Sequence, residues 1–203
     1  MSPCRALDLL IGPILAVVVI TGSAVGLGGC ASAVVGTGAA VGVAAFEERS
    51  VVTVARDAVI ASKIRLGLFN AGEKYITRIS IEVYEGRVLI TGATPDESMH
   101  AEAVHLAWKI EGVTDVINEI QISDTGFVNT IHDSLITARL TSSLTFDQEI
   151  LAINYSVETV NGIVYLIGVA QSSTELKRVI AHAHQISYVR KVISHVRVKK
   201  TGT

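Results

Sequence analysis

An internal duplication constrains the fold of this chain more than any other feature. Shifting the sequence by 76 residues aligns its two halves without a gap. The matched pairs include acidic, glycine and branched apolar positions: Asp57 with Asp133, Glu82 with Glu158, Gly86 with Gly162, Gly92 with Gly168, Val113 with Val189, and Ile117 with Ile193. A repeat at a fixed period is one supersecondary unit copied along the chain. The sequence therefore predicts two similar small domains, 47–123 and 124–203.

Each copy predicts the order helix, strand, strand, helix, strand. Apolar residues recur at spacings of three and four in the first helix, and they alternate in the strands. The expected elements are 52–68, 76–84, 87–91, 95–110 and 113–122 in the first copy, and 128–143, 153–159, 163–167, 173–187 and 189–198 in the second. We therefore expect an α+β fold of two tandem αββαβ domains, each a small three-stranded mixed sheet with two helices on one face.

Glycines mark the expected boundaries of these elements. Glu85-Gly86 and Asn161-Gly162 are turn sequences between the two hairpin strands, and Asn-Gly is a strong hairpin signal. Gly92 is expected to end the second strand of the first copy. Tyr188 stands where the first copy has Gly112, and this difference is expected to weaken the stop of the last helix.

The sequence Leu27-Gly28-Gly29-Cys30 follows an apolar run and has the pattern of a lipobox. We expect residues 1–29 to be a lipoprotein signal peptide, Cys30 to become an acylated N-terminus, and residues 30–46 to hold this lipidated cysteine and a flexible Ala/Gly/Val tether. Two alternatives stand beside this hypothesis. An uncleaved anchor over 9–25 would also place the chain at a membrane, although its core is shorter than the ~20 residues that a spanning helix prefers. The tract 31–46 could itself lie on the membrane surface.

Composition limits the other classes of protein. The chain has two cysteines, and Cys4 would leave with the leader, so neither a disulfide within one mature chain nor a cysteine metal site can form. The formal net charge is −2, but acids outnumber bases in 47–123 whereas bases outnumber acids in 130–203. This asymmetry indicates a charged partner for the second copy. It is too mild for nucleic acid, which calls for a more basic domain.

The repeated motifs resemble the BON domain (bacterial OsmY and nodulation). The likeness lies in the paired glycines, in Gly112-Val113-x-x-Val116-Ile117-Asn118, and in the combination of two copies with a lipobox and an Ala/Gly/Val tract. This combination is similar to dual-BON outer-membrane lipoproteins. The resemblance implies binding of anionic phospholipid by the second domain and support of envelope integrity. Ala31 after the lipidated cysteine implies an outer-membrane address on the periplasmic face.

Catalytic patterns are sparse, and we expect no enzyme, no metal and no cofactor. The histidines do not recur between the copies, and His182 and His184 are two apart on a predicted helix, where a zinc pair needs a spacing of four. No Gly-x-Ser-x-Gly elbow is present. Glu82 and Glu158 match between the copies, but their places on the polar face of a strand favour a solvated face over a carboxylate pair.

The candidate contact residues lie at the start of the second copy. Phe127, Val128, Ile131 and Arg139 combine apolar side chains with a cation on the helix 128–143, as an interfacial membrane contact requires. The alternative for each apolar residue is burial in the core or against the first domain. By the resemblance, this helix is the lipid-facing element, and the partners are the acyl anchor's membrane and its anionic phospholipid.

A second hypothesis comes from the sheets themselves. Each domain covers only one sheet face, so the opposite face and the open edges are free to meet a partner or the sister domain. A periplasmic scaffold or adaptor would use such edges, for example 113–122, to capture a protein of the outer-membrane assembly machinery.

Overall fold

The computed structural model describes residues 47–124 and 127–200, without the side chains of residues 127–129. The predicted signal peptide, Cys30 and the tether 30–46 lie outside the described residues, so their assignments stay predictions. All described residues belong to one compact unit of the chain.

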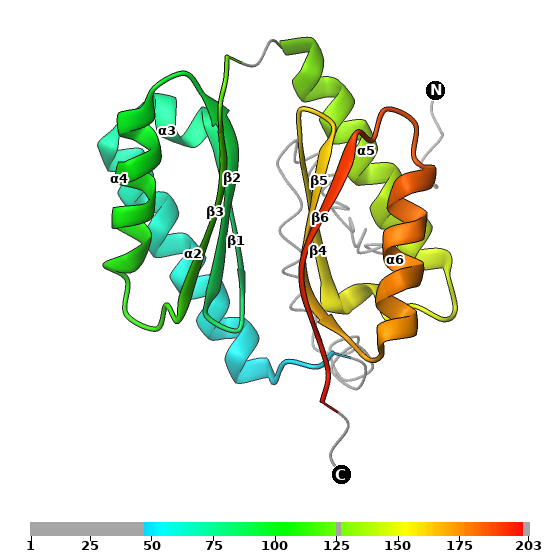
Figure 1. Ribbon diagram of the computed structural model, residues 1–203. Coiled ribbons are helices and arrows are strands. Elements are labelled where there is room, and N and C mark those ends of the chain that lie inside the picture. The colour runs from blue at the N-terminus through cyan, green and yellow to red at the C-terminus, as the bar shows by residue number, and fades with distance from the viewer. Residues whose placement is uncertain (1–46, 125–126, 201–203) are drawn as a thin grey trace, which may run out of the picture. The chain divides into compact units, whose positions relative to one another are not determined.

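Two copies of one αββαβ arrangement make up this unit (Figure 1). The first copy contains α2 (Val51–Ala71), α3 (Glu73–Arg78), β1 (Ile79–Tyr84), β2 (Arg87–Thr94), α4 (Glu97–Trp108) and β3 (Asp115–Ile122). The second contains α5 (Phe127–Phe146), a short 3-10 turn (Ala152–Asn154), β4 (Tyr155–Val160), β5 (Ile163–Ala170), α6 (Ser173–Gln185) and β6 (Lys191–Val198). The predicted α+β fold is confirmed.

The sheets have the orders β1-β2-β3 and β4-β5-β6. In each sheet the hairpin strands are antiparallel and the central strand pairs with the last strand in parallel, which makes both sheets mixed. Figure 1 shows α2 and α4 on one side of the first sheet, and α5 and α6 on one side of the second. β3 and β6 end their sheets, so each has an outer edge without a strand neighbour among the described residues.

Each domain has its own apolar core between helices and sheet. In the first, Ile60, Ile64 and Leu68 of α2 pack with Ile81 and Ile90 of the strands. The same helix face in the second domain carries Ile136, Leu140 and Leu144, which pack with strand residues of β5. The spacing of three and four that predicted the first helix of each copy is therefore the spacing of its buried face.

The other sheet faces are covered by the sister domain. Tyr84 and Leu89 of the first copy form one buried cluster with Tyr165, Ile167 and Val169 of the second. Of the two alternatives that the sequence leaves open for these faces, burial against the sister copy is the one found.

Several expected boundaries were wrong. The first strand of each copy begins later than predicted, because 73–78 forms the helix α3 and 152–154 forms a 3-10 turn. The strand β2 does not end at Gly92 but continues to Thr94, and Gly92 pairs with Ile79 inside the ladder. Pro95 lies before the helix α4, whose N-cap is Asp96.

Gly92 is required by a close backbone approach. It has a φ of 143°, and a Cβ there would collide with the carbonyl oxygen of Arg78. Gly168 repeats this arrangement in the second copy, with a φ of 150° and the carbonyl oxygen of Asn154 in the way. The two glycines therefore let the central strand pass close to the end of α3 in the first copy and of the 3-10 turn in the second. Neither glycine ends its strand.

A buried aspartate in the first helix of each copy holds the hairpin turn. Asp133 of α5 accepts hydrogen bonds from the backbone N–H groups of Asn161 at 2.6 Å and Gly162 at 2.7 Å. Asp57 of α2 does the same in the first copy, with the N–H of Glu85 at 2.8 Å and of Gly86 at 2.9 Å. The matched aspartates thus fix the first helix to the hairpin in both domains.

Candidate membrane-contact site

The helix α5 has a buried apolar face, and its exposed side carries large apolar side chains among polar ones. Its inner face carries buried Ile136 and Leu140, whereas Ile131 is 46% exposed and Leu135 is 48% exposed. Phe146, in its last turn, is 83% exposed. An ordinary surface helix presents polar side chains to water. The outer face of α5 is therefore a surface that a partner could cover.

The structure brings two of the predicted contact residues to one side of this helix. Ile131 and Arg139 are both exposed, and Leu135 stands midway between them at the spacing of four that places side chains on one face. Burial of Ile131 in the core, the alternative for this residue, was wrong. Phe127 and Val128 lie in the first turn of α5, and their side chains are outside the described part of the chain.

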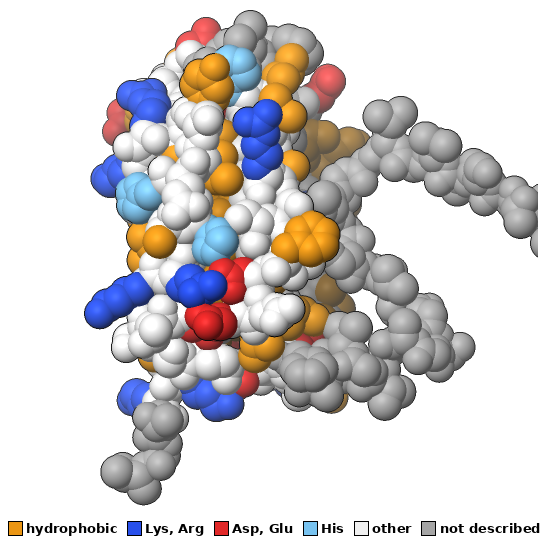
Figure 2. Space-filling model, turned by 90° about the vertical axis from the view of Figure 1, so that its right-hand side faces the viewer, with side chains coloured by type: hydrophobic (Ala, Val, Ile, Leu, Met, Phe, Trp, Pro, Cys, Tyr) orange, Lys and Arg blue, Asp and Glu red, His pale blue; other side chains and the backbone are white. Residues whose placement is uncertain are grey.

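Leu135 and Phe146 were missed by the sequence interpretation. The sequence held a signal for Leu135, because this residue lies one helical turn after Ile131 and outside the face on which Asp133 and Ile136 are buried. Figure 2 shows separate exposed apolar side chains among neutral, basic, histidine and acidic ones on the side of the second domain. Arg139 has no ion-pair partner among the described residues.

A shallow cavity of about 240 Å³ lies beside the start of α5. Its lining comes from α5, the β4–β5 turn and the segment before β6: His132, Asp133, Ile136, Asn161, Gly162, Tyr188 and Arg190. The rings of His132 and Tyr188 stack with centroids 5.4 Å apart. The cavity thus adds an aromatic pair and a cation next to the exposed apolar residues.

Tyr188 holds a backbone conformation that favours glycine. Its φ is 72°, where the first copy has Gly112 at 94°. The expected weakening of the helix stop was therefore wrong, because Tyr188 adopts the left-handed conformation in spite of its side chain. Its ring is 72% exposed. A strained residue of this kind persists where the surrounding structure imposes it.

Glu82 and Glu158 lie in a partly buried contact between the copies, which corrects the expectation of a solvated face. Both are partly buried, and the Ser80 hydroxyl donates to Glu158 at 3.2 Å. Burial raises the pKa of Glu158 to about 7, with a further contribution from the charge of Glu82. Burial likewise raises the pKa of Glu82, against the opposing effect of Arg65. The contact between the copies therefore holds two carboxyl groups whose pKa values lie above their usual range.

A serine, a histidine and an aspartate line up between α5 and α6. Nδ1 of His182 lies 2.7 Å from the Ser143 hydroxyl, and Nε2 lies 2.7 Å from Asp147. Asp147 also accepts from Arg178 at 2.6 Å, and this contact is the main cause that holds the pKa of Asp147 well below its usual range. Acyl-transfer triads need backbone N–H donors near the serine. Ser143 lies inside α5, where neighbouring N–H groups are committed to the helix. We infer that this chain of contacts ties α5 to α6.

The described residues offer two further limits. They contain no group of three or more His, Cys, Asp or Glu side chains placed to hold a metal ion. None of the helices in the described ranges has the length and apolar character needed to cross a membrane.

The duplication has a counterpart in known proteins. The family model of the BON domain matches residues 56–124 and 132–200. The chain is 32% identical over 192 residues to the outer membrane lipoprotein DolP of Haemophilus influenzae, an alignment that covers 91% of this chain and 96% of the relative.

Two further relatives share much of the sequence. A 21 kDa hemolysin of Actinobacillus pleuropneumoniae is 33% identical over 158 residues, covering 74% of this chain and 80% of the relative. A protein of Anaplasma centrale, named as an uncharacterized protein in the gshII 5'region, is 40% identical over 147 residues, covering 70% and 95%. Since the family model matches both copies and most of the chain, this protein belongs to the BON-domain family.

Proposed function

We propose that this protein is an outer-membrane lipoprotein, anchored through an acylated Cys30 on the periplasmic face. Its second BON domain contacts anionic phospholipid through the outer face of α5, and this contact supports the integrity of the envelope. The lipobox and the similarity to an outer membrane lipoprotein over nearly the whole chain support the address. The exposure of Ile131 and Leu135 beside Arg139 is the observation that carries the contact.

The contact site comprises Phe127, Val128, Ile131 and Arg139, to which the exposed side chains add Leu135 and Phe146. Burying an exposed Ile, Leu or Phe side chain contributes about 1.5–3 kcal/mol, and less where it is already half covered. A cation near an anionic surface contributes about 1 kcal/mol. A few such terms correspond to a dissociation constant of about 1 mM or somewhat tighter.

Such weak binding fits a protein that has a second attachment. The lipid predicted at Cys30 would itself anchor the chain at the membrane, so the α5 contact needs only a low affinity of its own. Linking two weak contacts through a tether raises the overall affinity without any new contact. The predicted lipid at Cys30 and the α5 face would therefore act together on one membrane.

Vesicle flotation of the mature chain carrying Cys30→Ser tests this proposal, because the lipid no longer masks the protein contact. We expect binding to phosphatidylglycerol or cardiolipin vesicles that weakens with salt and falls about tenfold or more in Ile131→Ser/Leu135→Ser. The matched control is Val198→Ser, which removes an exposed apolar side chain of the same domain away from α5. Equal flotation of all three proteins, or none by the folded parent at low salt, would contradict the α5 contact.

A further inference from the structure

The first helix of the other domain has an outer face that is even more apolar. On α2, Val52 is 68%, Val59 is 52%, Leu66 is 59% and Phe69 is 60% exposed. The opposite face of the same helix is buried in the core of the first domain. A helix that is apolar all round is ordinarily enclosed on all sides. The helix α2, in contrast, leaves these four large apolar side chains exposed to water.

These side chains form one continuous stripe along α2. Val52, Val59 and Leu66 are seven residues apart, and exposed Ala55 and Ser62 fill the positions between them. The stripe runs from Val52 to Phe69 and is therefore about 26 Å long. The other long helix of the domain differs, since α4 exposes Glu97, Glu102 and His105 on its outer side. Its one large exposed apolar residue is Trp108, at the end of the helix. The stripe is therefore a property of α2 and not of the whole domain surface.

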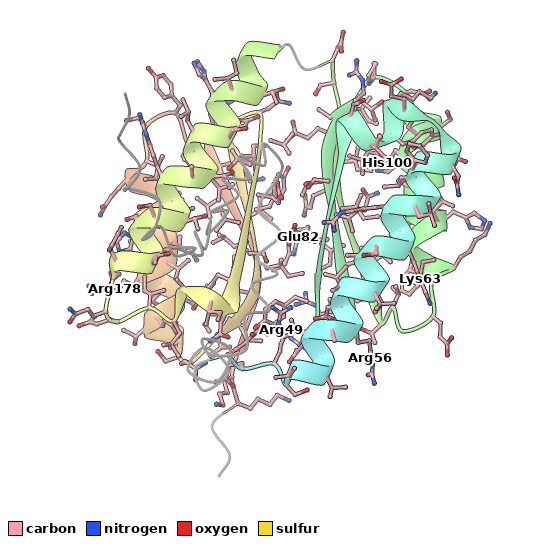
Figure 3. The ribbon with its side chains drawn as sticks, turned by 180° about the vertical axis from the view of Figure 1, so that it is seen from behind. Arg49, Arg56, Lys63, Glu82, His100 and Arg178 are labelled. Atoms are coloured by element: carbon pink, nitrogen blue, oxygen red, sulfur yellow. The ribbon has the colours of Figure 1, made fainter. Side chains whose placement is uncertain are left out.

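The charge beside the stripe is positive. Arg56 lies one turn after Val52, and Lys63 lies one turn after Val59. Both side chains therefore flank the stripe, and both extend away from α2 (Figure 3). Neither has an ion-pair or hydrogen-bond partner among the described residues. The one acid of α2, Asp57, is 3% exposed and its oxygens accept from the hairpin turn. The outer face of α2 thus combines apolar surface with unpaired cations and exposes no carboxylate.

This combination fits one kind of partner better than a second copy of the chain. Two α2 stripes packed as a coiled coil would bring Arg56 and Lys63 near the cations of the other helix, with no acid to offset the repulsion. An anionic bilayer accepts both parts of the face: the apolar stripe enters the headgroup boundary and the cations meet lipid phosphates.

The place of α2 in the chain supports the same partner. It is the first described helix, and only residues 31–50 separate it from Cys30. A segment of that length spans ~70 Å at most when fully extended. A lipid at Cys30 would therefore hold α2 within ~70 Å of the membrane surface, so that its contact with the bilayer is intramolecular.

We propose that α2 is a second membrane-contact helix, whose Val52–Phe69 stripe lies in the headgroup region of an anionic bilayer with Arg56 and Lys63 on lipid phosphates. Apart from the buried Asp57, the acids of the first copy lie outside the helix α2. The proposal goes beyond the α5 contact and is independent of it.

Site-specific labels on the acylated protein test this inference. The protein is purified from membranes, labelled with an environment-sensitive fluorophore at Val59→Cys or Leu66→Cys, and reconstituted into vesicles of phosphatidylethanolamine and phosphatidylglycerol. We expect the α2 labels to be quenched by spin-labelled lipid and shielded from aqueous iodide. A label at Ala101→Cys, exposed on α4 of the same domain, should stay accessible to iodide.

A label at Leu135→Cys on α5 reports the other contact separately, so either helix can fail alone. Two outcomes overturn the α2 contact. One is an α2 label as accessible to iodide as the Ala101 label. The other is an α2 label shielded equally in neutral detergent and in vesicles, because a second copy or the chain's own 31–46 segment would then cover the stripe.

Charge reversal gives the matched test of the cations. Each cation near an anionic surface changes the binding equilibrium about fivefold, so Arg56→Glu/Lys63→Glu should lower the ratio of lipid-facing to aqueous label by at least ~25-fold. The control Lys109→Glu/Lys177→Glu makes the same change in net charge at exposed cations outside α2. An equal effect of the two double variants would mean that only the net charge of the protein matters. This result would contradict a specific contact through α2.

Discussion

At the scale of single residues, the matched aspartates explain why the duplication kept its register. Asp133 presents one carboxylate oxygen to each of two backbone N–H groups, the partly buried one of Asn161 and the buried one of Gly162. A carboxylate accepting backbone N–H groups makes hydrogen bonds stronger than neutral ones. In the first domain, Arg49 also contacts the matched aspartate: its Nη1 lies 3.1 Å from Oδ2 of Asp57, and its guanidinium lies over the ring of Tyr84. The sequence matched the aspartates but could not reveal their hydrogen bonds, which join residues far apart in the chain.

We expect Asp133→Ala to lower the free energy of unfolding by about 2–4 kcal/mol, because the buried N–H of Gly162 and the partly buried N–H of Asn161 lose their acceptor. Asp133→Asn keeps one acceptor oxygen and should cost less. Urea unfolding followed by circular dichroism measures both. Asp124→Ala is the control: it removes an exposed carboxylate that pairs with Arg78, and such a surface ion pair contributes at most about 1 kcal/mol. Equal losses of stability in Asp133→Ala and in the control would contradict the role of Asp133 in holding the hairpin turn.

At the scale of elements, much of the fold could be predicted from the sequence. The order of helices and strands, the mixed sheets and the buried face of each first helix followed from periodicity. The helix α3 could not, because 73–78 contains Ile76 and Arg78 in an alternation that also suits a strand. The exposed stripes on α2 and α5 were hidden for a related reason: periodicity marks an apolar residue but does not say which of two apolar faces meets the core.

Two glycines show how the space around a residue decides whether a substitution stabilises or destabilises the element that contains it. We expect Gly168→Ala to lower the free energy of unfolding by about 2 kcal/mol or more, because the new methyl would collide with the Asn154 carbonyl at a φ of 150°. Gly67→Ala in α2 should raise it by about 0.5–1 kcal/mol, since its Cβ would meet Leu106 at an ordinary 3.6 Å. Thermal unfolding compares the two. A loss of stability in both variants would show that space at Gly67 is tighter than the backbone indicates.

At the scale of the whole molecule, the duplication allows both copies to present the same kind of face. Val59 of α2 matches Leu135 of α5 in the 76-residue register, and Lys63 matches Arg139; all four are exposed. The sequence had placed the membrane contact in the basic copy alone, because a sum of charges hides where the charges lie. With an outer apolar face on each first helix, the two copies could share the membrane contact.

The contact between the copies carries its own test through Glu158. Its folded pKa of about 7 is raised above the unfolded value near 4.3, so the folded protein binds more protons between these values. Stability should therefore fall as the pH rises through this window, and the penalty is complete above pH 7. Because the carboxyl is only partly buried, we expect Glu158→Gln to stabilise by about 1–2 kcal/mol at pH 8.5 and much less at pH 5.

Urea unfolding at the two pH values measures this difference, and subtracting the parent at each pH removes the contribution of the histidines. Glu111→Gln, at an exposed carboxylate of the first copy, should show no such gain at high pH. If Glu158→Gln is equally stable relative to the parent at both pH values, the carboxylates do not meet in solution. The buried cluster around Tyr84 and Tyr165 would then be left as the contact that joins the two copies.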